Sequence, residues 1–153
     1  MMDGAASSKP GWVLALSGVR FAVLRAQQDL ACPIGNDATI LRSVCEAIWW
    51  LCCCDEILEQ THGDIYKKYR EKDGLGEQMA ALRWARNRIT HQEAHWALIR
   101  PPLHWNEAGM IPTHPSRNAG YDAYRGHLEG REIFEPIEQQ CTWMRNYAMK
   151  FPW

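Results

Sequence analysis

Apolar residues recur along the chain with the period of an α-helix, and they divide it into four segments. The four predicted helices span residues 12–30, 37–60, 75–99 and about 131–147. Prolines mark their limits, because Pro33 follows the first helix and Pro101 and Pro102 follow the third. The second helix is apolar on more than one face, which predicts a central position.

The segments between these helices lack a helical or strand period. Residues 64–76 are charged and contain two glycines, which predicts a connector with at most a turn of helix, and residues 103–120 read as a loop rich in Pro, Gly and Asn. Residues 1–10 are small and polar, so we expect a disordered tail. Without strand alternation or a glycine-rich phosphate loop, the pattern predicts an all-α, four-helix-bundle-like single domain over residues 11–153.

Composition narrows the class of protein. The 153 residues carry 17 Lys and Arg against 18 Asp and Glu, so the chain has no overall positive charge. This balance argues against a protein that coats nucleic acid. Six cysteines occur without a CxxC pair, and three of them are adjacent at 52–54, which predicts reduced, packed thiols and a cytoplasmic location. The apolar run at 12–24 is interrupted by Arg20 and is too short to cross a membrane.

Candidate chemistry concentrates in the third helix, in the stretch 84-WARNRITHQEAHW-96. At about 100° per residue, an apolar face and a polar face separate on this helix. The apolar arc holds Leu82, Ala85, Ile89 and Trp96, and the polar arc holds Arg83, Asn87, Thr90 and His91. One face therefore packs and the other meets a polar environment.

A zinc site is one interpretation of this stretch, because His91 and His95 are four residues apart on one helical face. The zinc-protease pattern requires a glutamate directly after the first histidine, but the sequence reads HQEAH and places Glu93 about 160° from His95. We therefore expect no metal cofactor, although a metal-dependent protein using His91 and His95 stays an open alternative.

A phosphodiester-cleaving site is the other interpretation. Cleaving RNA without a metal requires a base for the 2′-OH proton, an acid for the leaving oxygen and a cation for the phosphorane charge. His91 can serve as the acid or base, and Arg86 can bind phosphate oxygens through its planar guanidinium. Asn87 is four residues before His91 and can orient the pair. Because Arg86 and His91 lie about 140° apart on a regular helix, a partner chain could complete the site.

The R-N-x-x-x-H arrangement of Arg86, Asn87 and His91 resembles the motif of the HEPN (higher eukaryotes and prokaryotes nucleotide-binding) superfamily. The segments 46–58, 81–92 and 127–133 look similar to small actinobacterial and phage proteins of that type. The resemblance implies a helical bundle that forms a homodimer, with a composite, metal-independent ribonuclease site, RNA as substrate and no cofactor. It also implies a toxin–antitoxin or antiviral-defence setting, with a cognate antitoxin or other regulatory protein as partner.

Further residues are candidates for contacts around this motif. We expect Arg83, Arg88 and His95 to bind substrate. A carboxylate of the second helix, Asp55 or Glu56, is a candidate to pair with Arg86 or another arginine across the bundle. Trp105 is a candidate for stacking on RNA bases. A non-catalytic module that binds RNA, nucleotide or a protein partner through the same polar face is the alternative function.

Overall fold

The computed structural model describes residues 10–34, 37–91, 98–99, 103–107 and 119–151. These residues form helices and one small antiparallel pair of strands. The helices are α1 (Gly11–Ala31), α2 (Asp37–His62), α3 (Asp64–Glu71), α4 (Gly74–His91), α5 (Ala119–His127) and α6 (Phe134–Lys150). The strands are β1 (Leu98–Ile99) and β2 (His104–Trp105).

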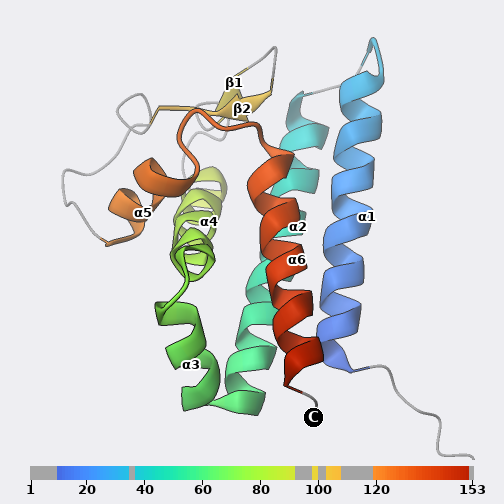
Figure 1. Ribbon diagram of the computed structural model, residues 1–153. Helices are drawn as coiled ribbons and strands as arrows, with labels where there is room; N and C mark the ends of the chain where they lie inside the picture. The colour runs from blue at the N-terminus through green and yellow to red at the C-terminus, as the bar shows by residue number, and fades with distance from the viewer. Residues whose placement is uncertain (1–9, 35–36, 92–97, 100–102, 108–118, 152–153) are drawn as a thin grey trace, which may run out of the picture.

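The four long helices α1, α2, α4 and α6 form the bundle, with α6 crossing in front of α2 (Figure 1). Their apolar faces meet in one core, which includes Ile48, Leu51, Leu58, Leu82 and Ile137. The predicted all-α class and the three helices at 12–30, 37–60 and about 131–147 are confirmed. The predicted tail lies almost entirely outside the described residues. None of the helices in the described part of the chain has the length and apolar character needed to span a membrane.

The α1–α2 pair depends on a close approach at one glycine. An added Cβ on Gly18 would lie 2.4 Å from the Trp50 ring, so only a residue without a side chain leaves room for the indole. Arg25 and Glu46 form an ion pair across the same two helices. This packing places Trp50 against α1.

An aromatic cluster attaches α3 to the end of α6. The ring centroids of Tyr66 and Tyr147 lie 4.8 Å apart, and those of Tyr69 and Trp143 lie 5.5 Å apart. Offset and edge-to-face contacts of this kind add stability beyond the area that they bury. The charged segment predicted as a connector is therefore a helix of 8 residues, longer than the single turn expected.

The prediction of a third helix reaching Ile99 was wrong, because α4 ends at His91 and residues 98–99 form β1. Prolines at 101 and 102 favour extended backbone before them, and the strand pairs Leu98 with Trp105. The sequence did not predict helix α5, which begins at the end of the predicted loop and continues beyond it. Its two glycines weaken the local helical signal, and its buried Tyr124 is held by tertiary contacts, with the hydroxyl donating to the Asn106 carbonyl at 2.6 Å.

Candidate functional site

Helix α4 carries the predicted motif, and its start depends on two local features. The Asp73 carboxylate accepts a hydrogen bond from the Leu75 backbone N–H at 3.0 Å, which caps the first turn. Gly76 faces the backbone of α3, because a Cβ there would lie 1.9 Å from the Arg70 carbonyl oxygen. These contacts place α4 beside α3 and α2, with the motif in its last turns.

The two faces predicted for this helix are present in its described residues. Leu82, Ala85 and Ile89 are buried in the core, while Asn87 is exposed and Arg86 is half-buried. Trp96 lies outside the described residues. The two motif residues whose side chains are described, Arg86 and Asn87, therefore lie outside the buried face of α4.

Arg86 and Asn87 contact each other directly. Asn87 Oδ1 accepts hydrogen bonds from Arg86 Nη2 at 3.1 Å and from Arg86 Nε at 3.4 Å. Such a contact restricts the guanidinium to a narrower range of orientations than a solvated arginine would have. Asn87 thus helps to fix the orientation of the Arg86 guanidinium.

Arg86 also lies near the surface of α2. Burial raises the pKa of the Cys45 thiol to about 11, and the positive charge of Arg86 acts in the opposite direction. Burial likewise raises the pKa of the Cys52 and Cys53 thiols, and Arg86 again opposes the shift. The guanidinium is therefore close to the α2 segment that contains these three cysteines.

His91 is the last residue of α4. Its side chain, like the whole of His95, lies outside the part of the chain that the structure describes. The helix nevertheless fixes the relation of the backbones: His91 follows Arg86 by five positions, a rotation of about 140° and a rise of about 7.5 Å. The backbone of one chain therefore places positions 86 and 91 on different sides of α4.

The other two arginines predicted to bind substrate are engaged within the chain. Arg83 Nη2 forms an ion pair with Asp55 of α2. The Arg88 guanidinium lies over the Trp84 ring, 5.0 Å from its centroid, in a cation–π contact. On α4, the arginine that pairs with Asp55 is therefore Arg83, one helical turn before the motif.

Asp55 is the centre of a buried polar cluster that joins three helices. Its carboxylate is fully buried and accepts hydrogen bonds from the Tyr66 hydroxyl at 2.5 Å and from Arg70 Nη1 at 2.9 Å, in addition to Arg83. Burial, reinforced by the negative charge of Asp55, raises the pKa of Tyr66 well above its usual range. A small cavity of about 180 Å³ adjoins the two arginines. The sequence singled out Asp55 but neither Tyr66 nor Arg70.

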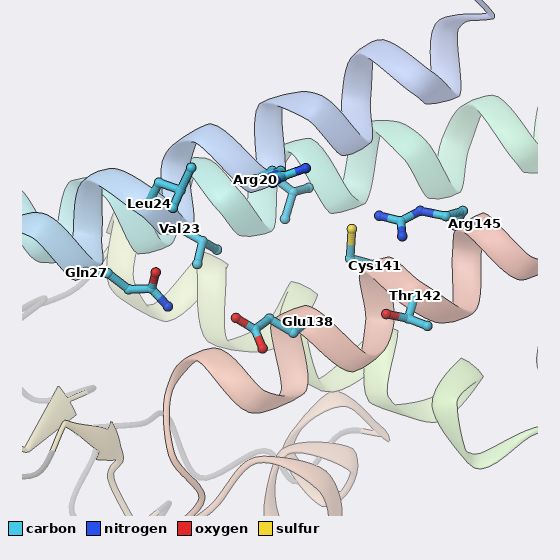
Figure 2. Close-up of a pocket in the computed structure, with 9 residues that line it drawn as sticks. Arg20, Val23, Leu24, Gln27, Glu138, Cys141, Thr142 and Arg145 are labelled. Carbon is cyan, nitrogen blue, oxygen red and sulfur yellow. The ribbon is translucent and has the colours of Figure 1, made fainter.

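A larger hollow, of about 400 Å³, lies between α1 and α6 and had no counterpart in the sequence analysis. Figure 2 shows Cys141 between Arg20 and Arg145, with Glu138 and Gln27 toward the other end. Burial raises the pKa of the Cys141 thiol, and Arg145 opposes the shift. No predicted catalytic residue that the structure describes lines this groove.

Among the described side chains of the α4 motif, Arg86, oriented by Asn87, offers a cation that can bind an anion, and proton transfer at His91 stays a prediction. Among the described residues, no three His, Cys, Asp or Glu side chains gather in a way that could hold a metal ion. His127 contacts Glu77 at 3.1 Å, away from the motif. Comparison of the chain with protein-family models, with curated proteins and with solved structures finds no match.

Proposed function

We propose that the protein is a HEPN-like, metal-independent endoribonuclease with its site at Arg86, Asn87 and His91. The observation that carries the proposal is the contact between Asn87 Oδ1 and the Arg86 guanidinium, which orients a cation on the same helix as a histidine, five positions before it. Metal-free phosphodiester cleavage requires proton transfer and a cation for the phosphorane charge, and a histidine and an arginine can supply them. The resemblance of the R-N-x-x-x-H motif to the HEPN superfamily supports the same reaction.

The reaction is an intramolecular transesterification. One histidine removes the 2′-OH proton, and the 2′-oxygen attacks the adjacent phosphorus as the bond from phosphorus to the 5′-oxygen breaks. The leaving 5′-oxygen takes up a proton from solvent water, and the protonated histidine returns its proton to the solvent, so that one histidine suffices for each site. Arg86 stabilises the extra negative charge of the phosphorane. The products are a 2′,3′-cyclic phosphate and a 5′-hydroxyl, with no net consumption of water.

A homodimer supplies the geometry that one chain lacks. The charge of Arg86 opposes the rise in pKa that burial causes at two thiols on α2, so Arg86 lies toward that helix. The helical rotation places position 91 about 140° away from position 86. Two copies related by a twofold axis can place the Arg86 of one opposite the His91 of the other, because each surface then meets its own equivalent. In a composite site the arginine and the histidine come from different chains, so they need not lie on the same side of one helix. A toxin–antitoxin or antiviral-defence setting, with an antitoxin or other regulatory protein as partner, belongs to this proposal.

A non-catalytic binding module is the second candidate, and one observation favours it. Arg83 and Arg88 both have partners within the chain, so fewer cations on α4 remain for flanking phosphates than the motif alone suggests. Phosphate contacts dominate the affinity of proteins for nucleic acids, and the overall charge of −1 adds no attraction. The same face would then bind RNA, a nucleotide or a protein without cleaving it.

Cleavage in the presence of EDTA separates the two candidates. A mixed RNA pool is incubated with the wild-type protein and with His91→Ala, and the ends of any fragments are analysed. The ribonuclease gives cyclic-phosphate ends and loses about 10²-fold to 10⁴-fold in rate on substitution, the usual contribution of acid–base catalysis. Equal behaviour of the two proteins would leave a binding module, and activity abolished by EDTA would indicate a metal enzyme instead.

A further inference from the structure

Helix α2 leaves one narrow stripe of its surface uncovered. Between residues 41 and 59, all of which the structure describes, the only exposed residues are Arg42, Trp49 and Glu56, here called the Trp49 stripe. They are seven residues apart, about two helical turns, so they lie in one line along the helix. Trp49 is 48% exposed, whereas Trp105, the candidate for base stacking, is fully buried and cannot present a ring face to RNA. The stripe therefore holds an exposed indole midway between a positive and a negative charge.

The two charges of the Trp49 stripe differ from the carboxylates around them on α2. Glu46, Asp55 and Glu59 each pair with an arginine of a neighbouring helix. Arg42 and Glu56 have no ion-pair partner among the residues that the structure describes. Both charges are therefore available to a partner outside the chain.

The neighbouring side of α1 extends this surface with apolar side chains. Helices α1 and α2 lie side by side (Figure 1), and Gly18 of α1 lies against the Trp50 ring, which packs edge-on against Trp49 with ring centroids 4.8 Å apart. Leu14 and Phe21 lie within an arc of about 60° with Gly18 on α1, and they are 58% and 67% exposed. The apolar surface around Trp49 thus continues onto α1, and a contiguous exposed apolar patch is typical of an interaction site.

The order of the charges indicates which partner fits this surface. In a dimer with a twofold axis, each surface meets its own equivalent. When two copies of α2 pack antiparallel with the axis at Trp49, the seventh residue before Trp49 in one copy meets the seventh residue after it in the other. At the shallow crossing angle of about 20° that is usual in bundles, Arg42 of each copy then faces Glu56 of the other. A parallel arrangement would bring like charges together instead.

We propose that the Trp49 stripe and the adjoining side of α1 form the homodimer interface, with the twofold axis at Trp49 and ion pairs between Arg42 of each chain and Glu56 of the other. The proposed function requires a dimer but assigns no interface to it, and this inference does not depend on RNA cleavage. Aromatic side chains at the centre and charges at the rim are the usual composition of a protein interface. The charge pairs at the rim set the orientation of the two chains.

The same axis is compatible with a composite site on α4. Helix α4 runs antiparallel to α2 (Figure 1), and the ion pair of Arg83 with Asp55 marks a common level of the two helices. At about 1.5 Å per residue, position 86 lies about 4.5 Å beyond this level, Trp49 about 9 Å and position 91 about 12 Å. Positions 86 and 91 thus lie on either side of the level of Trp49. A twofold axis at Trp49 brings position 86 of one chain toward the level of position 91 of the other.

Charge reversal followed by sedimentation velocity tests the pairing. Wild-type protein is expected to sediment as a dimer. Arg42→Glu and Glu56→Arg each place like charges at both rim positions, so each weakens the dimer by about 10-fold or more. The double variant Arg42→Glu/Glu56→Arg restores opposite charges, and its dissociation constant returns to near that of wild type. An equal mixture of the two single variants forms a heterodimer, because every rim pair again joins opposite charges.

Arg20→Glu is the matched control. Arg20 is an exposed arginine that lines the groove between α1 and α6, outside the Trp49 stripe. The same charge reversal at this position leaves the dissociation constant unchanged. Circular dichroism verifies that all variants are folded.

Each outcome supports or overturns the interface. A monomeric wild-type protein overturns it, and so does a dimer that the reversals at Arg42 and Glu56 leave intact or that the double variant fails to restore. A dimer that follows the charge reversals but does not cleave RNA in EDTA supports the interface and refutes the ribonuclease. Cleavage by a protein whose oligomeric state does not respond to the reversals supports the ribonuclease and overturns this interface.

Discussion

Replacing Asp55 by Asn removes the charge at the centre of the buried cluster and keeps its volume. Two guanidiniums, on Arg70 and Arg83, then lose their shared carboxylate, and the Tyr66 hydroxyl loses a charged acceptor. Breaking a buried ion pair by removing one partner costs about 3–5 kcal/mol. The Arg70 and Arg83 side chains are 25% and 38% exposed, so water can rehydrate them in part. We therefore expect a loss of about 3 kcal/mol, the lower end of that range.

Urea unfolding followed by circular dichroism measures this loss. With a denaturant dependence of about 2 kcal/mol per molar urea, the midpoint falls by about 1.5 M. Glu59→Gln is the matched control, because Glu59 also pairs with Arg70, at 3.1 Å, but lies at the surface, where such pairs contribute less than about 1 kcal/mol. Combining Asp55→Asn with Arg83→Met removes one unpaired charge and recovers part of the loss, a non-additivity that a double-mutant cycle detects. A loss below about 1 kcal/mol for Asp55→Asn, or an equal loss for Glu59→Gln, would refute the reasoning.

Two further predictions concern backbone packing and thiol chemistry. Gly76→Ala places a Cβ 1.9 Å from the Arg70 carbonyl oxygen and should lower the free energy of unfolding by about 3 kcal/mol or more. Gly74→Ala, whose Cβ would meet nothing within 4 Å, should change the free energy of unfolding by no more than about 0.5 kcal/mol. Equal urea midpoints for the two variants would contradict this prediction. Because burial raises the pKa of Cys45 to about 11, its thiolate fraction at pH 8 is on the order of 100-fold below that of an ordinary cysteine. Iodoacetamide labelling read by mass spectrometry should therefore modify exposed Cys32 well before Cys45, and comparable rates would refute the burial argument.

The long helices could be predicted from the sequence because their cores repeat at the helical period. Leu82, Ala85 and Ile89 show this most clearly, since their spacing alone separates the buried face of α4 from the face of Asn87. Helix α5 could not be predicted in this way. It is held by contacts of Tyr124 with distant residues, which outweigh a weak local preference.

The sequence indicated one member of the buried polar cluster, Asp55, but not which arginines pair with it. The sequence marks Asp55 as a partner for an arginine across the bundle, and the arginines turn out to be Arg70 and Arg83. The relative offset of α2 and α4 decides which arginine reaches the carboxylate, and side-chain packing between helices sets that offset. Trp105 was misjudged for a similar reason, because loop composition indicates exposure while the packing of α5 buries it.

Complementation between two inactive variants tests the central claim most directly. Arg86→Ala and His91→Ala chains are co-expressed with different tags, and the heterodimer is isolated by successive affinity steps and incubated with RNA in EDTA. A composite site predicts that each homodimer is inactive and that the heterodimer, which pairs an intact Arg86 with an intact His91 from the other chain, cleaves RNA to cyclic-phosphate ends. A wild-type protein that fails to cleave, or a His91→Ala homodimer as active as wild type, would contradict the ribonuclease, and an inactive heterodimer beside an active wild type would contradict the composite site.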